Sequence, residues 1–385
     1  MKTQKQIRSL VHKAKSLLDS WLRSLENPEE YQHRVLNSLI QAYSKTGYGE
    51  RHKAEEVDGI EAFRNAFPIM DYQRLLPYLR EILSGNYRAL LSEPPIFFGA
   101  TSGTTGKPKL IPITKSEMER RMEIILKGAM QYASFWKDPE ILGSPCLTLH
   151  LPSRVREIKC GGMQIPCGYV SGLQAEYFHK ALGLGESPLL KGINALGPGV
   201  KPEDWSRRFS LVYEFFKEAD VRWAVGSPIP LYLFARWLRR RLGVWPKDVW
   251  NFHVLFCGGV PHIHERHEGS LKRMYGWDAR IVEMYGATEG LYAMQMDDKP
   301  YITPFYDVYL YEVVVGGKVK MLHEMEAGEK GSLVVSSQIL PRYRIGDLIK
   351  CYTPIRHFKV LGRDDVATRL GLLAKGLIQG FVSLF

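Results

Sequence analysis

One stretch of the chain, Thr101 to Thr114, gathers the residue types that bind phosphate. It reads TSGTTGKPKLIPIT. Its glycines allow backbone conformations closed to other residues and let amides approach a ligand, while its hydroxyls and lysines add donors and positive charge. The candidate phosphate ligands are Ser102, Gly103, Thr104, Thr105, Gly106 and Lys107. The stretch therefore predicts a phosphate site, although a polar surface turn rich in glycine and threonine has the same composition.

The spacing of this loop excludes the two commonest nucleotide loops. A Walker A loop needs glycine and Ser or Thr where Thr101 and Pro108 stand. A dinucleotide fingerprint needs a third glycine and a following helix. Apolar residues precede the loop at 95–100 and follow it at Ile111 and Ile113. We therefore expect the loop to connect two strands.

A second informative string is VEMYGATEGLY, from Val282 to Tyr292. Its apolar start predicts a strand that ends near Tyr285 and is followed by Thr288 and Glu289. A carboxylate such as Glu289 could bind magnesium together with phosphate oxygens, and Tyr285 could stack on a base. An ordinary turn with a solvent-facing Glu289 is an equally open interpretation.

A third string, PRYRIGDLIK, places Asp347 after Gly346 at an expected strand end. One carboxylate can accept hydrogen bonds from both hydroxyls of a ribose, each worth about 1.5 to 3 kcal/mol because the acceptor is charged. The alternative is a turn aspartate paired with Arg342 or Arg344.

The string HIHERH, His262 to His267, has the histidine spacing of a binuclear zinc site, but Arg266 stands where an aspartate ligand is needed. A cation there opposes metal binding, so we predict the start of a polar helix. The chain has five cysteines, which are scattered along it. Their odd number and spacing argue against a disulfide framework and favour a reducing, cytoplasmic location.

The formal charge of +11 suits an anionic ligand such as a nucleotide. No recognition module for nucleic acid is visible, and the run at 239–241 is interpreted as the solvated face of an amphipathic helix. The first 25 residues are apolar at helical spacing without a continuous apolar core, so we expect a packed helix rather than a signal peptide. No apolar run approaches the roughly 20 residues that span a bilayer.

The order of patterns along the chain predicts an α/β fold. Residues 1 to about 90 are mostly helical in pattern, including a second helix from Pro28 to Tyr43. From about 95 to 290, short β-rich runs alternate with amphipathic stretches. From about 301 to 360, β-rich runs and turns predict a smaller antiparallel sheet.

Taken together, TSGTTGKPK, YGATEG, YRIGD and LGRDD resemble the ordered core motifs of adenylate-forming enzymes, the superfamily of acyl-CoA synthetases and luciferase. Within it, NPEEYQ, TGYGERH and FPIMDYQRLLPYLREILSG resemble the Gretchen Hagen family of acyl-acid amido synthetases. The resemblance runs from Asn27 to about Thr368. It implies a large N-terminal domain with mixed sheets flanked by helices and a small β-rich subdomain, covering residues 1–360.

The resemblance also implies a two-step reaction with ATP and Mg²⁺, in which a carboxylic acid forms an acyl-adenylate and an amine, commonly an amino acid, then displaces AMP. The glycine-rich loop would hold phosphates. The backbone of Gly258 and Gly259 would lie close to adenine, and the ring of Tyr285, beside Gly286, would stack on the adenine. Thr288, Glu289 and Lys107 would serve catalysis, with Glu289 binding the metal. Asp347 would hold the ribose, and Arg363 the ribose or phosphate.

The family pattern fades after Arg369, where the expected continuation into a smaller lid with a catalytic lysine is not found. We therefore interpret 361–385 as a hinge at Asp365 and a truncated or divergent remnant of the lid. Two other functions stay open, an acyl-CoA ligase with the same nucleotide motifs and a nucleotide- or acyl-binding protein without catalysis. We expect neither nucleic acid nor membrane insertion, and the acyl substrate is not fixed by any string.

Overall fold

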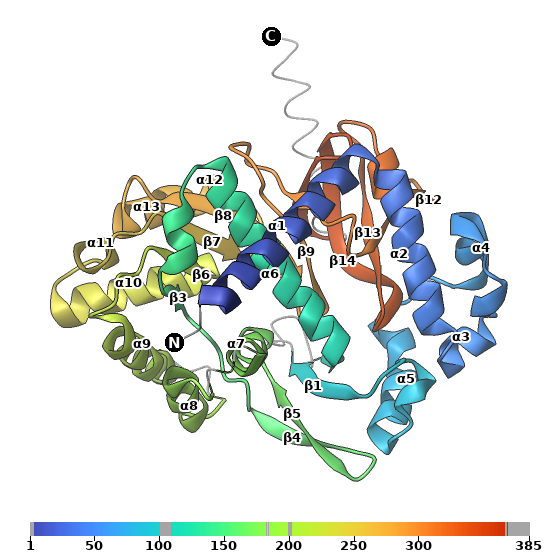
Figure 1. Ribbon diagram of the computed structural model, residues 1–385, viewed down its shortest axis with the longest axis horizontal. Helices are drawn as coiled ribbons and strands as arrows, with labels where there is room; N and C mark the ends of the chain where they lie inside the picture. The colour runs from blue at the N-terminus through green and yellow to red at the C-terminus, as the bar shows by residue number, and fades with distance from the viewer. Residues whose placement is uncertain are drawn as a thin grey trace.

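The computed structural model describes residues 4–100, 109–181, 183, 185–198, 202–365 and 368. Helices surround three sheets, which lie in different parts of the molecule (Figure 1). The predicted α/β class with mixed sheets and a β-rich part is confirmed. The structure also confirms that the N-terminal part is mostly helical.

The N-terminal part begins with two long helices and continues in short ones. Pro28 opens the second helix at the position where a missing amide N–H is harmless, and this helix has the predicted bounds. Asp71 caps a later helix by accepting from the backbone N–H of Arg74 at 2.9 Å. The elements are α1 (Gln4–Glu26), α2 (Pro28–Tyr43), α3 (Gly47–Arg51), η1 (Ala54–Glu56), α4 (Gly59–Ala66), α5 (Tyr72–Ser84) and η2 (Tyr87–Ala89).

A four-stranded sheet follows, in the order β2-β1-β5-β4. Strands β1 and β2 are antiparallel neighbours whose register ends at Ala100 opposite Leu110. The glycine-rich loop therefore connects two strands, as predicted, although residues 101–108 lie outside the described part of the chain. The strands are β1 (Pro95–Ala100), β2 (Leu110–Thr114), β4 (Arg156–Cys160) and β5 (Met163–Gly168).

The six-stranded sheet has the order β10-β9-β8-β7-β6-β3. Its strands β3, β6, β7 and β8 are parallel, β9 is antiparallel to β8, and β10 is antiparallel to β9. The parallel strands are short apolar runs, which is typical of parallel strands covered on both faces. The strands are β3 (Cys146–Thr148), β6 (Trp223–Gly226), β7 (Val254–Gly258), β8 (Arg280–Ala287), β9 (Gly290–Met294) and β10 (Thr303–Pro304).

The helices of this region lie around the six-stranded and four-stranded sheets (Figure 1). Arginines 239–241 are exposed at the end of one of them, as expected for a solvated helix face. The helices are α6 (Lys115–Phe135), η3 (Pro139–Gly143), α7 (Val170–Ala181), α8 (Pro188–Ala195), α9 (Pro202–Phe216), α10 (Pro228–Leu242), α11 (Pro246–Val249), α12 (Ile263–Arg266) and α13 (Glu268–Tyr275).

The third sheet is the predicted antiparallel one, in the order β12-β11-β13-β14-β15. Its longest strand, β14, contains a bulge, because Ser332 and Val334 of β13 pair with Leu348 and Arg344. A bulge bends a strand and re-aims the side chains beside it. The elements are β11 (Leu310–Val315), β12 (Lys318–Met321), η4 (Leu322–Glu324), β13 (Lys330–Ser337), β14 (Leu340–Thr353) and β15 (His357–Arg363).

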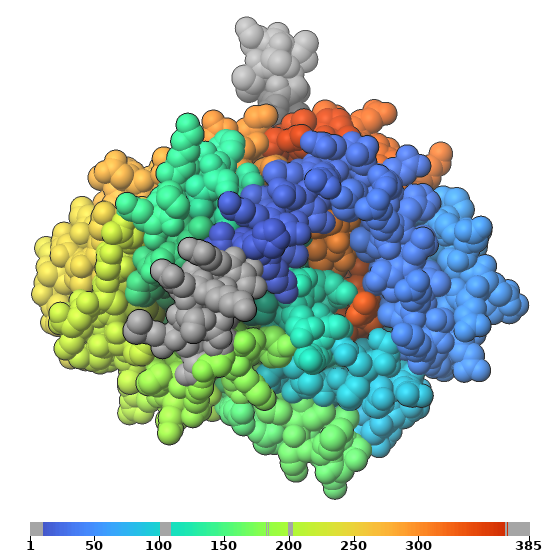
Figure 2. Space-filling view, viewed as in Figure 1, coloured from blue at the N-terminus to red at the C-terminus, as the bar shows by residue number. Residues whose placement is uncertain are grey.

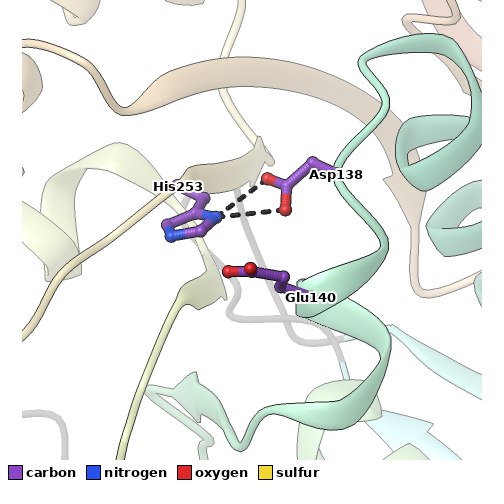
Figure 3. Close-up of side chains that lie close together, drawn as sticks. All are labelled: Asp138, Glu140 and His253. Carbon is purple, nitrogen blue, oxygen red and sulfur yellow. Dashed lines mark hydrogen bonds and ion pairs between the residues drawn. The ribbon is translucent and has the colours of Figure 1, made fainter.

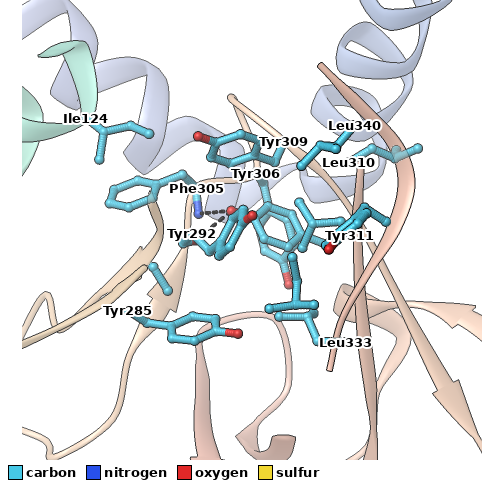
Figure 4. Packing of buried hydrophobic residues seen from close by; sticks show 14 of the residues in the cluster. Ile124, Tyr285, Tyr292, Phe305, Tyr306, Tyr309, Leu310, Tyr311, Leu333 and Leu340 are labelled. Carbon is cyan, nitrogen blue, oxygen red and sulfur yellow. Dashed lines mark hydrogen bonds between the residues drawn. The ribbon is translucent and has the colours of Figure 1, made fainter. Parts of the chain in front are cut away.

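Tyrosines fill the core between the six-stranded and five-stranded sheets (Figure 4). The ring of Tyr292 in β9 lies 5.7 Å from that of Tyr285 and 5.3 Å from that of Tyr309, centroid to centroid. The hydroxyl of Tyr311 donates to the carbonyl oxygen of Tyr292 at 2.5 Å. Such phenols satisfy buried polar groups while filling the core. They fix the hairpin of β8 and β9 against the five-stranded sheet.

The first two helices are held by backbone groups from far along the chain. Trp21 Nε1 donates to the carbonyl of Pro304 at 2.8 Å. The amide nitrogen of Gln32 donates to the carbonyls of Tyr306 and Tyr309, each at 2.8 Å. The N-terminal segment consequently lies across the front of the molecule and covers later elements (Figure 2).

Within the described ranges, no helix combines the length and hydrophobicity needed to cross a membrane. All five cysteines lie in the described part of the chain and all are free.

Candidate functional site

The parallel strands of the six-stranded sheet end beside two glycines. A Cβ on Gly258 would lie 2.7 Å from the carbonyl oxygen of Met284, so no larger residue fits against β8 there. Gly259 follows with φ +83°, a conformation that glycine adopts without strain. Ligands of open α/β sheets bind at this carboxyl edge of the strands. The predicted residues Gly258 and Gly259 therefore lie next to the strand that carries Tyr285.

Asp347 is the meeting point of three strands. The hydroxyl of Tyr285 in β8 donates to its Oδ2 at 2.7 Å, and Nη1 of Arg363 in β15 donates to its Oδ1 at 3.0 Å. Arg363 also donates to the carbonyl of Ile345 at 3.2 Å. The family resemblance implies one site for these three residues, which stand in separate strings, and the structure brings them together.

The electrostatics of this group follow from its burial. Burial raises the pKa of Asp347, while the guanidinium of Arg363 and the hydrogen bond from Tyr285 act in the opposite direction. Burial, followed by the charge of Asp347, raises the pKa of Tyr285 well above its usual value. Tyr285 is therefore a neutral donor at physiological pH, aimed at a carboxylate that sits in a low-dielectric environment.

Two expectations for Asp347 are corrected by the structure. It does not lie at a strand end, because β14 continues through the bulge to Thr353. The alternative pairing with Arg342 is also wrong, since Arg342 pairs with Glu312 at 2.8 Å. Gly346, with φ +86°, marks the bulge that sequence analysis interpreted as the end of the strand.

Thr288 and Glu289 form the turn between β8 and β9, because Ala287 pairs with Gly290. Glu289 is only 6% exposed, and its Oε1 accepts from the hydroxyl of Tyr343 at 3.4 Å. A solvent-facing Glu289 is thus excluded. Gly286 packs tightly before the turn, as its Cβ position is 2.7 Å from a methyl of Leu291.

This turn lies against the strand that enters the glycine-rich loop. A Cβ on Gly99 in β1 would be 2.8 Å from Cγ2 of Thr288. On the other side of the loop, the backbone N–H of Leu110 donates to the hydroxyl of Tyr72 at 2.9 Å, and Nζ of Lys109 lies 5.3 Å from the centre of the Tyr72 ring. The loop candidates Ser102, Gly103, Thr104, Thr105, Gly106 and Lys107 lie outside the described residues, but the strand that enters the loop contacts the turn at Thr288.

Residues 18–181 match the model of the GH3 family N-terminal domain. The chain is 32% identical over 97 residues to the indole-3-acetic acid-amido synthetase GH3.2 of Arabidopsis thaliana, a segment that covers 25% of this chain and 18% of that relative. It is 34% identical over 98 residues to GH3.17 of the same plant, covering 25% of this chain and 16% of the relative. The resemblance to GH3 enzymes is thereby confirmed.

Solved structures show that the fold extends beyond the matched GH3 segment. An acyl acid amido synthetase, AtGH3.15, superimposes with a TM-score of 0.73 at 16% identity, over 91% of this chain and 70% of that one. A 2-hydroxyisobutyryl-CoA ligase superimposes with a TM-score of 0.58 at 16% identity, over 86% of this chain and 74% of that one. The chain therefore shares its fold with both of these enzymes.

A second group of ionisable residues is not indicated by any of the sequence strings. Asp138, Glu140 and His253 bring one ligand atom each within 4.8 Å of the others (Figure 3). His253 Nδ1 lies 3.0 Å from Asp138 Oδ2, and the guanidinium of Arg222 pairs with Glu140. The group lies where β7 begins, away from the carboxyl edge. Since a guanidinium already neutralises Glu140, the group is better explained as an ion-pair network than as a metal centre.

The HIHERH string makes no metal site either. Its residues Ile263–Arg266 form the predicted short polar helix α12. His264 is engaged at both ring nitrogens, with Glu268 at 2.7 Å and Gln295 at 2.9 Å. The most consequential residue that the sequence patterns missed is Arg121, whose contact with Thr288 joins segments 167 positions apart.

Proposed function

We propose that this protein activates a carboxylic acid with ATP and transfers the acyl group to an amine, commonly an amino acid. One observation carries the proposal. Asp347, Tyr285 and Arg363 share a site with the Thr288–Glu289 turn, which in turn packs on the strand that enters the glycine-rich loop. A carboxylate suited to ribose hydroxyls, a candidate metal ligand and the strand that enters the glycine-rich loop lie around one carboxyl edge, which supports a nucleotide site there.

The chemistry has two steps. A carboxylate oxygen of the acid attacks the α-phosphorus of ATP, and the bond to the bridging oxygen breaks as pyrophosphate leaves with the electron pair. The amine nitrogen then attacks the acyl carbon, AMP leaves, and the extra proton on nitrogen passes to solvent. Such transfers depend mainly on positioning and charge neutralisation.

The residues of the site fit these tasks. Asp347 accepts bonds from the ribose hydroxyls, and Arg363 beside it binds the ribose or phosphate. Tyr285 supports adenine beside Gly258, Gly259 and Gly286. Thr288 contacts the α-phosphate, and the loop residues from Ser102 to Lys107 hold the outer phosphates.

Glu289 fits the metal ligand, because its carboxylate is a hard oxygen donor and is only 6% exposed next to Thr288. Mg²⁺ bound there supplies charge neutralisation to the phosphates. Tyr343 orients this carboxylate through its hydroxyl, at 3.4 Å from Oε1.

An acyl-CoA ligase is the second candidate, and the likeness of fold to 2-hydroxyisobutyryl-CoA ligase favours it. The two candidates share the nucleotide site and differ in the acceptor. The GH3 match over residues 18–181 favours an amine. We propose that residues 1–360 form the adenylate-forming large domain, and that the five free cysteines reflect a cytoplasmic location.

The decisive experiment measures ATP binding by calorimetry with Mg²⁺ and acid-dependent pyrophosphate release on the same sample. Indole-3-acetate and 2-hydroxyisobutyrate are the first acids, because proteins similar to this chain act on them by name. Amino acids and coenzyme A are then compared as acceptors by mass spectrometry of the product.

Each outcome selects one function. An amide product supports the amido synthetase, and a thioester selects the ligase. ATP binding without pyrophosphate release across a wide acid panel selects a nucleotide-binding protein without catalysis. Absence of both activities rejects the proposal.

A further inference from the structure

Helix α6 starts directly at the end of β2, the strand that leaves the glycine-rich loop. Oγ1 of Thr114, the last residue of β2, accepts the backbone N–H of Glu117 at 3.3 Å and caps the helix. The helix then runs beside β9 (Figure 1). Its first turns therefore bridge the space between the loop and the hairpin of β8 and β9.

Two fully buried charges stand in these turns. Glu117 and Arg121 are both 0% exposed, and Nε of Arg121 donates to Oε1 of Glu117 at 2.9 Å. Nη2 of the same guanidinium donates to the carbonyl oxygen of Thr288 at 3.0 Å. One planar group thus ties the helix to the turn, in a geometry that the rigid fork of arginine provides and a lysine does not.

A buried ion pair adds little net stability, because desolvation offsets the attraction, and its best attested role is to specify one arrangement. The arrangement specified here is that of the Thr288 peptide. Glu289 follows immediately in the chain. The orientation of the Thr288 peptide therefore fixes the position of the Glu289 Cα, from which the carboxylate side chain extends. No bond from Arg121 to Glu289 itself is needed for this effect.

We propose that Arg121, held by Glu117, is a positioning residue that orients the Thr288–Glu289 turn for magnesium-bound ATP. The inference rests on the proposed function and assigns to α6 a role that the sequence strings do not contain. It couples the exit strand of the phosphate loop to the metal ligand through a single side chain.

The same helix provides a matched control. Lys127 forms a buried ion pair with Asp307, with Nζ at 2.5 Å from Oδ2 and the two side chains 1% and 5% exposed. This pair ties α6 to the segment before β11, away from the turn. Lys127→Met and Arg121→Met therefore make the same kind of change, because each removes the cation from a buried ion pair of α6.

The test measures the dissociation constant of ATP by calorimetry with Mg²⁺ and with EDTA, and the Mg²⁺ concentration for half-maximal pyrophosphate release. We expect Arg121→Met to raise the dissociation constant of magnesium-bound ATP at least tenfold. The dissociation constant of ATP measured in EDTA should change less than threefold. Lys127→Met should keep the wild-type ratio of the two constants. The half-maximal Mg²⁺ concentration should rise about fivefold in the Arg121 variant alone.

A second variant keeps the test decisive if Arg121→Met does not fold. Arg121→Lys keeps the charge but loses the fork, and it is compared with Glu289→Gln and with the double variant. If Arg121 acts through the turn, the double variant is no worse than Glu289→Gln. Additive losses, or a wild-type magnesium preference in Arg121→Lys, overturn the inference. A wild-type protein that neither binds ATP nor releases pyrophosphate instead overturns the proposed function.

Discussion

The hydroxyl of Tyr285 lies 2.7 Å from Oδ2 of Asp347 and links the six-stranded sheet to the five-stranded sheet. The two residues are 62 positions apart; Tyr285 is buried, and the side chain of Asp347 is 14% exposed. A ligand that bonds to Asp347 therefore binds at a residue that is hydrogen-bonded to both sheets.

Replacing Asp347 by alanine should weaken ATP binding more than tenfold, which corresponds to about 1.4 kcal/mol. The reason is that each lost ribose bond to a charged acceptor is worth about 1.5 to 3 kcal/mol. Calorimetry measures the effect. Tyr285→Phe serves as the control, because it removes a partner of the carboxylate but leaves the carboxylate, and it should weaken ATP less. Unchanged affinity in Asp347→Ala would remove the ribose assignment.

Glu283 gives the chain a distinctive pH dependence. Burial raises its pKa to about 7, against weaker opposing effects of His264 and Lys359. A folded pKa above the unfolded value means that the stabilising contribution is present below pH of about 4.5 and is lost as pH rises through about 7. Glu283→Gln should therefore gain stability over wild type as pH rises from 5 to 8, by about 3 kcal/mol at most.

Urea unfolding at several pH values measures this difference, and Glu265→Gln is the matched control. Burial alone would raise the pKa of Glu265, but the hydrogen bond from Lys359, a backbone hydrogen bond and the charges of Lys359 and His262 together lower that pKa overall. The Glu265 variant should therefore lose stability relative to wild type, with no gain between pH 5 and 8. A parallel pH profile for wild type and Glu283→Gln would contradict the prediction.

Gly99 should be coupled to Thr288. An alanine Cβ at position 99 would lie 2.8 Å from Cγ2 of Thr288, closer than a normal contact, while its other neighbours are flexible side-chain ends at 3.2 Å. Gly99→Ala should lower the melting temperature and pyrophosphate release, and adding Thr288→Ser, which lacks that methyl, should restore part of both. A double-mutant cycle should show coupling of about 1 kcal/mol, and simple additivity would show that the contact is not the cause.

Glu312 should be a large contributor to stability. It is 1% exposed and accepts from Arg342 at 2.8 and 3.0 Å and from Arg64 at 3.0 Å. Glu312→Gln leaves the buried guanidinium of Arg342 without its counterion and Arg64 with only the exposed Glu61, at a cost of about 3 to 5 kcal/mol in guanidinium unfolding. Glu61→Gln removes the exposed partner of Arg64 and should change stability by about 0 to 1 kcal/mol. Equal effects of the two variants would argue against the buried network.

Local patterns predicted much of this fold because the signals were local. Pro28 and the helical spacing after it predicted α2, and the apolar run before Tyr285 predicted β8. The hairpin of β4 and β5 was missed, although Gly161 and Gly162, with φ +54° and +90°, form the glycine pair that marks such a turn.

The site was predicted only in part, for a physical reason. Tyr285 and Asp347 lie in strings whose residue types suit a nucleotide, and the family resemblance adds Arg363, so all three could be named before the fold was known. Arg121 lies in an ordinary amphipathic stretch, and only tertiary packing brings it to Thr288. The bulge that aims Asp347 likewise comes from pairing with β13, which a pattern in β14 alone does not reveal.

The anchoring of the first helices has a consequence for synthesis. Gln32 is fully buried, and its side-chain amide forms hydrogen bonds with backbone groups 274, 277 and 279 positions later. The indole N–H of Trp21 donates to the carbonyl oxygen of Pro304, which is 283 positions later. During translation α1 and α2 therefore emerge with an apolar face and a buried amide whose partners do not yet exist. Such late long-range contacts slow folding and expose nascent chains to aggregation. We expect the emerging N-terminal helices to be the segment on which chaperones act.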